Sequence, residues 1–254
     1  MKAFTAFTKK EWMESIRSWR LYILLAVFLL LGIMSPLTAL IMPHLLNGAD
    51  LGGIIIELPE PTALDSWTQF FSNVSQIGNL TLIITFTGIM ANEFSRGTLI
   101  NLLTKGMKRY IIILSKFFTA SVIWTLGYLL CLGVTYLYTA LYWPESTLYH
   151  PFLAFFSPWL LGQLFIVLLI LGGIATGNFY GSLLAGGGTV IGLNVLNLVP
   201  AIRRFNPISL AAQTLTLLTG QNGPQDFLPA VYLTLISIST LLILSILIFN
   251  KKKI

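Results

Sequence analysis

The stretch from Leu21 to Met42 reads LYILLAVFLLLGIMSPLTALIM, contains no charged residue and decides the class of this protein. An α-helix rises about 1.5 Å per residue, so roughly 20 apolar residues cross the hydrocarbon core of a bilayer, which is about 30 Å thick. The apolar part of a secretory signal is shorter, about 7–15 residues, and a small-residue cleavage site follows it, which this stretch lacks. We therefore expect residues 21–42 to remain in the chain as a transmembrane helix.

The composition of the whole chain indicates the same class. Hydrophobic residues make up 56% of the 254 residues and charged residues only 9%, whereas about a quarter of a soluble domain is charged. The net charge of +6 does not indicate nucleic-acid binding, because the basic residues lie beside apolar runs and no basic-aromatic motif is present. Cys131 is the single cysteine, so no disulfide can form within the chain.

Further apolar stretches are long enough to cross the bilayer. The predicted fold class is an all-α polytopic membrane protein, in which residues 1–254 form one transmembrane domain. An amphipathic helix in the membrane interface is expected over residues 1–20, with Trp12 and Ile16 on one side and Lys10 and Glu14 opposite. Six spans follow, at residues 21–42, 70–91, 111–142, 158–177, 182–199 and 228–249.

The distribution of basic residues predicts the orientation of these spans. With six spans, all 15 Lys and Arg residues except Arg203 and Arg204 fall on one side, which the positive-inside rule assigns to the cytoplasm. The protein is then a multi-pass plasma-membrane protein with both termini in the cytoplasm. If 182–199 were only re-entrant, five spans would satisfy the rule almost as well, but length and the C-terminal lysines favour six. Residues 200–227 are expected to form an external or a re-entrant segment.

One segment between the second and third spans has a pattern of its own. Residues 92–110 read NEFSRGTLINLLTKGMKRY, which predicts a helix end, a break at Gly97, a short amphipathic turn and a second break at Gly106. This segment would offer a partner protein a small apolar surface surrounded by charges. The alternative is an ordinary basic cytoplasmic loop.

The pattern of this segment resembles that of the ABC-2 type permeases, the membrane subunits of ATP-driven ABC exporters. The resemblance covers about 25 residues as a motif and nearly the whole chain as a layout. The chain departs from the family by having Lys105 and Gly106 where proline is frequent, and by carrying Arg203 and Arg204 on the external side. The positions that match the motif are Glu93, Gly97, Thr98, Leu102, Leu103, Arg109 and Lys116.

The resemblance implies a permease that forms the translocation pathway with a second permease copy or with a homologous permease. Because the sequence has no G-x-x-x-x-G-K-[ST] phosphate loop, two copies of a separate nucleotide-binding ATPase subunit would hold ATP and Mg, and this chain would bind no cofactor and be no enzyme itself. The substrate would be a drug, an antimicrobial peptide or a small amphiphile. The residues expected to couple the chain to the ATPase are Glu93, Arg96, Gly97, Thr98, Leu99, Leu102, Leu103, Lys105 and Arg109.

Small and polar residues inside the spans allow two interpretations each. Gly173, Gly177, Gly181, Gly188 and Gly192 are spaced for close helix packing, either between the fourth and fifth spans or at a dimer or sliding interface. The second span begins with polar residues that either line a cavity or lie in the interface. These polar residues are Ser72, Asn73, Ser75, Gln76 and Asn79.

Two other classes of function compete with transport. The first is a membrane sensor, scaffold or immunity protein that acts by binding, and the second is an intramembrane enzyme. No paired intramembrane carboxylate or nucleophile motif supports catalysis, and His44 and His150 lack metal-ligand spacing. Association with an ATPase subunit would separate a transporter from both.

Overall fold

The computed structural model describes residues 2–47, 60–104, 106–144 and 147–252, and in this part of the chain every regular element is a helix. Six helical segments are long and apolar enough to cross a membrane, so the predicted fold class is confirmed. These segments are Arg20–Met42 within α2 (Arg20–Asn47), Ala63–Ser95, α7 (Arg109–Tyr142), α8 (Pro151–Thr176), α9 (Phe179–Leu196) and α13 (Pro224–Lys251).

Local sequence signals explain where several helices begin and end. The Thr62 and Asp65 side chains form a capping box at the start of the second segment, and Pro151 and Pro224 occupy first-turn positions of α8 and α13. Gly177 ends α8 with a φ of 76°, which glycine adopts readily. Because of these signals the fourth, fifth and sixth spans begin earlier than we predicted.

The second membrane-spanning segment, Ala63–Ser95, consists of four consecutive helical pieces. These are α3 (Ala63–Asn73), a π-helix η1 (Val74–Gly78), α4 (Asn79–Phe86) and α5 (Gly88–Ser95). A π-helical turn shifts the helical register, and such turns occur frequently at functional sites. The polar residues predicted at the start of this span lie in and beside the π-helix.

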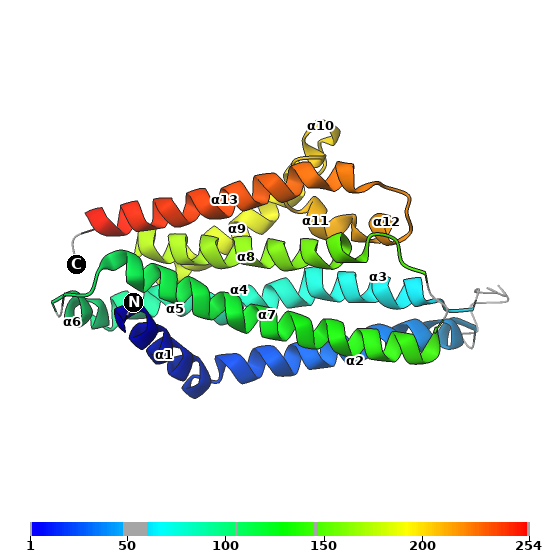
Figure 1. The fold of residues 1–254 in the computed structure, drawn as a ribbon, viewed down its shortest axis with the longest axis horizontal. Coiled ribbons are helices and arrows are strands. Elements are labelled where there is room, and N and C mark those ends of the chain that lie inside the picture. The colour runs from blue at the N-terminus through cyan, green and yellow to red at the C-terminus, as the bar shows by residue number, and fades with distance from the viewer. Residues whose placement is uncertain (1, 48–59, 105, 145–146, 253–254) are drawn as a thin grey trace.

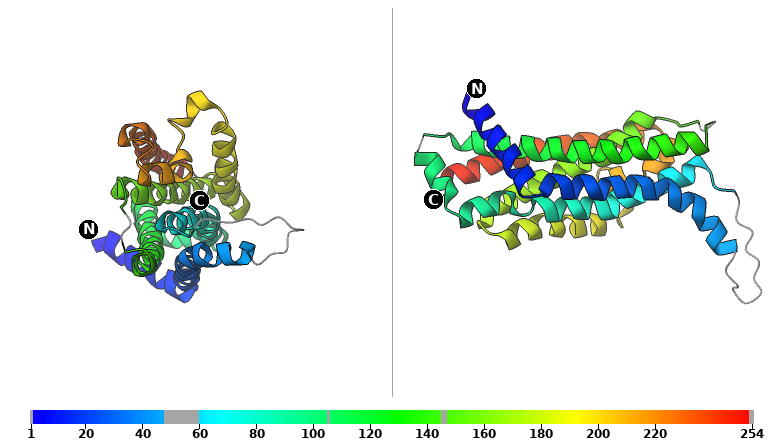
Figure 2. Two further views of the ribbon diagram at one scale, coloured as in Figure 1. Left: turned by 90° about the vertical axis from the view of Figure 1, so that its right-hand side faces the viewer. Right: turned by 90° about the horizontal axis from the view of Figure 1, so that it is seen from below.

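The long helices run side by side in an elongated bundle, and both chain ends lie at the same end of it (Figure 1). Near these ends lie α6 (Thr98–Thr104) and α1 (Lys2–Arg17), which is steeply inclined to the long helices (Figures 1 and 2). Helix α8 is the most buried of the six segments and packs against α7, α9 and α13. By contrast, few residues of α9 and α13 are buried, as in helices that face lipid or a partner.

The segment 200–227, for which two placements were open, contains three short helices before α13 begins. They are α10 (Pro200–Arg203), α11 (Ser209–Ala212) and α12 (Thr214–Leu218). Both α11 and α12 pack against α8 and lie beside it within the length of the bundle (Figure 1). These short helices are therefore part of the bundle, and the position of residues 200–227 relative to a membrane stays a prediction.

Candidate functional site

The segment 92–110 has the broken course that its glycines predict. Helix α5 ends at Ser95, α6 spans Thr98–Thr104, and Gly97 and Gly106 between the helices have φ values of 64° and 80°. A Cβ atom at either glycine would meet nothing within 4 Å among the described residues. Glycine is therefore required there by the left-handed backbone and not by crowding.

A partly buried group of charged side chains lies where α1, α5 and α7 meet. We call Lys10, Glu11, Glu14, Glu93 and Lys116 the ionic cluster. The Lys116 Nζ atom lies 2.9 Å from Glu11 Oε2 and 3.1 Å from Glu93 Oε1, and all three side chains are at most 5% exposed. Lys10 Nζ lies 2.6 Å from Glu93 Oε1 and 2.9 Å from Glu11 Oε1. Each buried charge therefore has a partner of opposite sign, as burial requires.

The ionic cluster also reaches α6 and the surface. The Thr98 hydroxyl, at the start of α6, donates to Glu93 Oε2, so one carboxylate holds α6, α1 and α7 together. At the outer edge of the cluster, Lys10 lies 2.8 Å from Glu14 Oε2. Burial acts to lower the pKa of Lys10, but the nearby carboxylates outweigh it and raise the pKa. Burial likewise acts to raise the pKa of Glu14, but the hydrogen bond from Lys10 lowers it overall.

A metal ion is not needed to balance these carboxylates. Oxygen atoms of Glu11, Glu14 and Glu93 approach within 4.8 Å of one another, which is close enough to share a metal ligand set. The ammonium groups of Lys10 and Lys116 already bind these oxygens. We therefore assign no metal to the ionic cluster.

Helix α1 contacts the bundle through Phe7, Glu11 and Ser15, which are buried, whereas Trp12 and Ile16 are half-buried. We predicted no role for Glu11 from the sequence. A signal for it existed in the sequence, because Lys116 lies inside an apolar span, where an ammonium group needs a carboxylate partner.

The predicted coupling residues differ in exposure. Glu93 and Leu99, which were expected to couple the chain to the ATPase, are buried, so their side chains are not exposed to a partner in this structure. Leu102 and Leu103 are half-buried and pack against the core. Lys105 lies outside the described residues. The exposed side chains here include Arg96, which follows α5, and Ile100 and Asn101 on α6.

Arg109 has an internal role that its position in the motif did not reveal. Its Nη1 atom donates to the backbone oxygens of Phe249, Asn250 and Lys252. The distance is 3.2 Å to the Asn250 oxygen and 2.8 Å to the Lys252 oxygen. A cation at these free carbonyls stabilises the C-terminal end of α13. Lys252 in turn donates to the carbonyls of Ile174 and Ala175 at the end of α8.

An open cleft of about 490 Å³ lies between α1 and the junction of α5 with α6. It borders the outer side of the ionic cluster. A protein segment bound there would therefore contact residues that ion pairs connect to the long helices. The residues that line it include Glu14, Arg17, Arg20, Asn92, Arg96 and Thr98.

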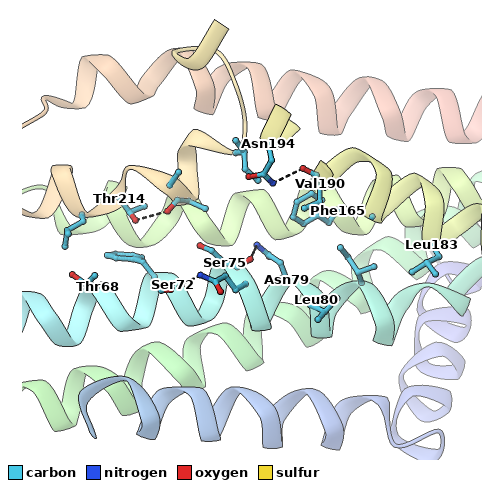
Figure 3. A pocket seen from close by; sticks show the side chains of 18 residues that line it. Thr68, Ser72, Ser75, Asn79, Leu80, Phe165, Leu183, Val190, Asn194 and Thr214 are labelled. Carbon is cyan, nitrogen blue, oxygen red and sulfur yellow. Dashed lines mark hydrogen bonds between the residues drawn. The ribbon is translucent and has the colours of Figure 1, made fainter. Parts of the chain in front are cut away.

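A larger cavity of about 700 Å³ lies farther along the bundle, between the π-helical segment and α9 (Figure 3). Thr68, Ser72, Ser75, Gln76 and Asn79 line one wall, so four of the five polar residues at the start of the second span line a cavity. The fifth, Asn73, does not line it and instead donates to Ser35 on α2 at 3.0 Å. Asn194 on α9 and Thr214 on α12 line the opposite wall (Figure 3).

The glycines that were predicted to pack do not all do so. A Cβ atom at Gly173 would lie 3.0 Å from Met90, and one at Gly181 would clash with Thr176. Gly177 is a turn residue between α8 and α9. At Gly188 and Gly192 a Cβ atom would meet nothing within 4 Å in the described chain, so the prediction that they pack between the fourth and fifth spans is wrong.

Comparison with known proteins adds one relative. No family model matches the chain. The chain is similar to the uncharacterized transmembrane protein YxlG of Bacillus subtilis (strain 168), with 24% identity over 220 residues, which are 84% of each chain. This similarity and the six apolar helices support a transmembrane protein with several spans.

Proposed function

We propose that this chain is the permease subunit of an ATP-binding cassette exporter in the cell membrane, with both termini in the cytoplasm. Two permease copies would form the pathway, and two copies of a separate ATPase subunit would bind ATP and Mg and drive it. The observation that carries the proposal is the ionic cluster, because it joins α1, α5, α6 and α7 beside an open cleft at the end of the bundle that holds both termini.

The ionic cluster supports a role in transmitting force. A partner that moves α6 acts on Glu93 through Thr98, and Glu93 is bound to Lys10 on α1 and Lys116 on α7. Helix α5 belongs to the same membrane-spanning segment, Ala63–Ser95, as the π-helix that lines the large cavity. A rigid-body displacement at the terminal end would therefore reach the cavity wall, as expected in domain-motion mechanisms.

The docking surface that we propose differs from the one that the sequence predicts. It consists of Arg96, Ile100 and Asn101, which are exposed, together with Arg17 at the cleft. Ile100 offers an apolar side chain that is 49% exposed, and the arginines around it suit carboxylates on the partner.

The first test establishes the side of the membrane on which α6 lies. Cys131 is buried, and its replacement by serine gives a background for a single Asn101→Cys variant. We expect a membrane-impermeant maleimide to label this cysteine in inverted vesicles and not in intact cells. Labelling in intact cells would place α6 outside and would overturn the proposal, because no ATPase subunit could reach it.

The second test asks whether an ATPase subunit binds at the cleft. The tagged chain, purified from membranes of its native cell, should carry vanadate-sensitive ATP hydrolysis well above an untagged control. Arg96→Glu should reduce this activity at least tenfold, whereas Arg204→Glu, an exposed arginine near α10, should leave it unchanged. If the wild-type chain carries no such activity, the ABC exporter proposal is wrong.

A further inference from the structure

The 700 Å³ cavity has two walls of different character. The wall formed by α3, η1 and α4 is rich in hydroxyl and amide groups, while Leu183 and Val190 on α9 and Phe165 on α8 are apolar (Figure 3). A volume of this size is typical of small-molecule sites, which are mostly apolar with a few polar groups that fix orientation.

Two polar atoms at this wall have no partner. Asn79 is 6% exposed, and its Oδ1 atom is buried without a hydrogen bond among the described residues. Its Nδ2 atom donates to the backbone oxygen of Ser75 at 3.1 Å, which fixes the orientation of the amide. The hydroxyl oxygen of Ser75 is likewise buried and unpartnered in this part of the chain. An unpaired buried acceptor is unfavourable, by about 1–3 kcal/mol, unless something donates to it.

The charge of the lining restricts what binds there. No Lys, Arg, His, Asp or Glu is among the described residues that line the cavity. An ionised ligand would enter without a counter-charge, which is strongly unfavourable at membrane depth. The ligand class that fits is therefore uncharged.

The cavity opens on the side of the bundle. Leu80, at its edge, is 57% exposed, and Gln76 and Thr68 on the same helical segment are also exposed. These residues belong to an apolar helical segment long enough to span the membrane, so the opening lies where lipid would surround the bundle. A ligand dissolved in the bilayer has direct access.

We propose that this cavity binds a neutral amphiphile, which forms hydrogen bonds through a hydroxyl or amide group to the polar wall at Ser72, Gln76 and Asn79 and places its apolar part along α9. That this amphiphile is the exported substrate rests on the proposed function. Its binding to the cavity does not depend on an ATPase partner.

The test uses the chain alone in phosphatidylcholine vesicles, with two photoactivatable lipids that carry the same diazirine acyl chain. Diacylglycerol is neutral and has a hydroxyl donor, while phosphatidic acid is anionic. After illumination, mass spectrometry locates the labelled residues. We expect diacylglycerol to label residues 68–83 and 183–194 at least fivefold more than phosphatidic acid, with competition by unlabelled dioleoylglycerol.

Two variants separate the cavity from general lipid contact. Asn79→Leu should reduce diacylglycerol labelling of the cavity at least fivefold. Gly187→Trp should also remove it, since Gly187 lines the cavity and a Cβ atom there meets nothing within 4 Å among the described residues. Gly133→Trp on α7 is the matched control, because its Cβ atom has equal space away from the cavity. Thermal unfolding of each variant checks that it folds.

Several outcomes would overturn this inference. Equal labelling by both lipids would show that charge does not select the ligand. Labelling that persists in Gly187→Trp would place the lipid elsewhere. If neither lipid labels the cavity and Leu80→Cys cross-links two copies of the chain, the cavity is an interface between copies. Because the ATPase subunit is absent throughout, these results are independent of the ABC exporter assignment.

Discussion

The ammonium group of Lys116 on α7 lies 2.9 Å from both carboxylate oxygens of Glu11 on α1, and both side chains are almost completely buried. This pair attaches a steeply inclined N-terminal helix to the long-helix bundle. Glu93 on α5 shares the same ammonium group, so three helices depend on one lysine.

Replacing Lys116 by methionine should strongly destabilise the protein. The variant leaves the buried carboxylates of Glu11 and Glu93 with Lys10 alone, and removal of one partner from a buried ion pair costs about 3–5 kcal/mol. Thermal unfolding in detergent measures the loss. The double variant Lys116→Met with Glu11→Gln should recover part of the stability, and a double variant no more stable than the single one would contradict direct pairing.

Removal of the Arg109 side chain should loosen the end of α13. Arg109→Ala leaves the carbonyl oxygens of Phe249, Asn250 and Lys252 without this donor, at a cost of about 1–2 kcal/mol for a cation at a helix C-terminus. Hydrogen exchange of residues 246–252 should become faster. Lys108→Ala, the exposed neighbour, is the control. Equal exchange in wild type and Arg109→Ala would show that the cap is unimportant.

Two glycine substitutions should differ in their effect on stability. At Gly172 on α8 a Cβ atom would lie 2.4 Å from Ala185 and 2.8 Å from the Gly181 carbonyl on α9, so Gly172→Ala must push the helices apart and should cost about 1–3 kcal/mol. At Gly188 the same change meets no described atom within 4 Å and should be neutral or stabilising by up to about 1 kcal/mol. Thermal unfolding compares the two, and equal effects would refute this packing.

Acidification should remove the contribution of Glu14 to stability. Its pKa is lowered from the ordinary 4.5 by the hydrogen bond from Lys10, against the opposing effect of burial. A lowered pKa stabilises the folded state above the ordinary value, and the contribution disappears as pH falls through the folded value. The difference in unfolding temperature between wild type and Glu14→Gln should therefore be present at pH 6 and decline below about pH 4.5. A difference that does not change with pH would contradict the ion pair.

The polar start of the second span shows how far the sequence leads. Ser72, Ser75 and Asn79 allowed two interpretations, the lining of a cavity or a position in the membrane interface, and the sequence fits both. The structure decides for a cavity because α9 and α12, more than 100 residues farther along the chain, form its other wall. Sequence spacing carries no information about contacts at that separation without a known fold.

The sequence by itself determined the all-α membrane class, the six apolar helices and the backbone breaks at Gly97 and Gly106. These properties depend on length, hydrophobicity and local backbone preference, which each stretch of residues carries with it. Only the tertiary structure decided that Glu11 pairs with Lys116, that Leu99 faces inward, that Arg109 caps α13 and that Gly188 is free of contacts within the described chain. The physical reason is that burial and pairing depend on which distant helix supplies the neighbouring surface, and no local pattern specifies that helix.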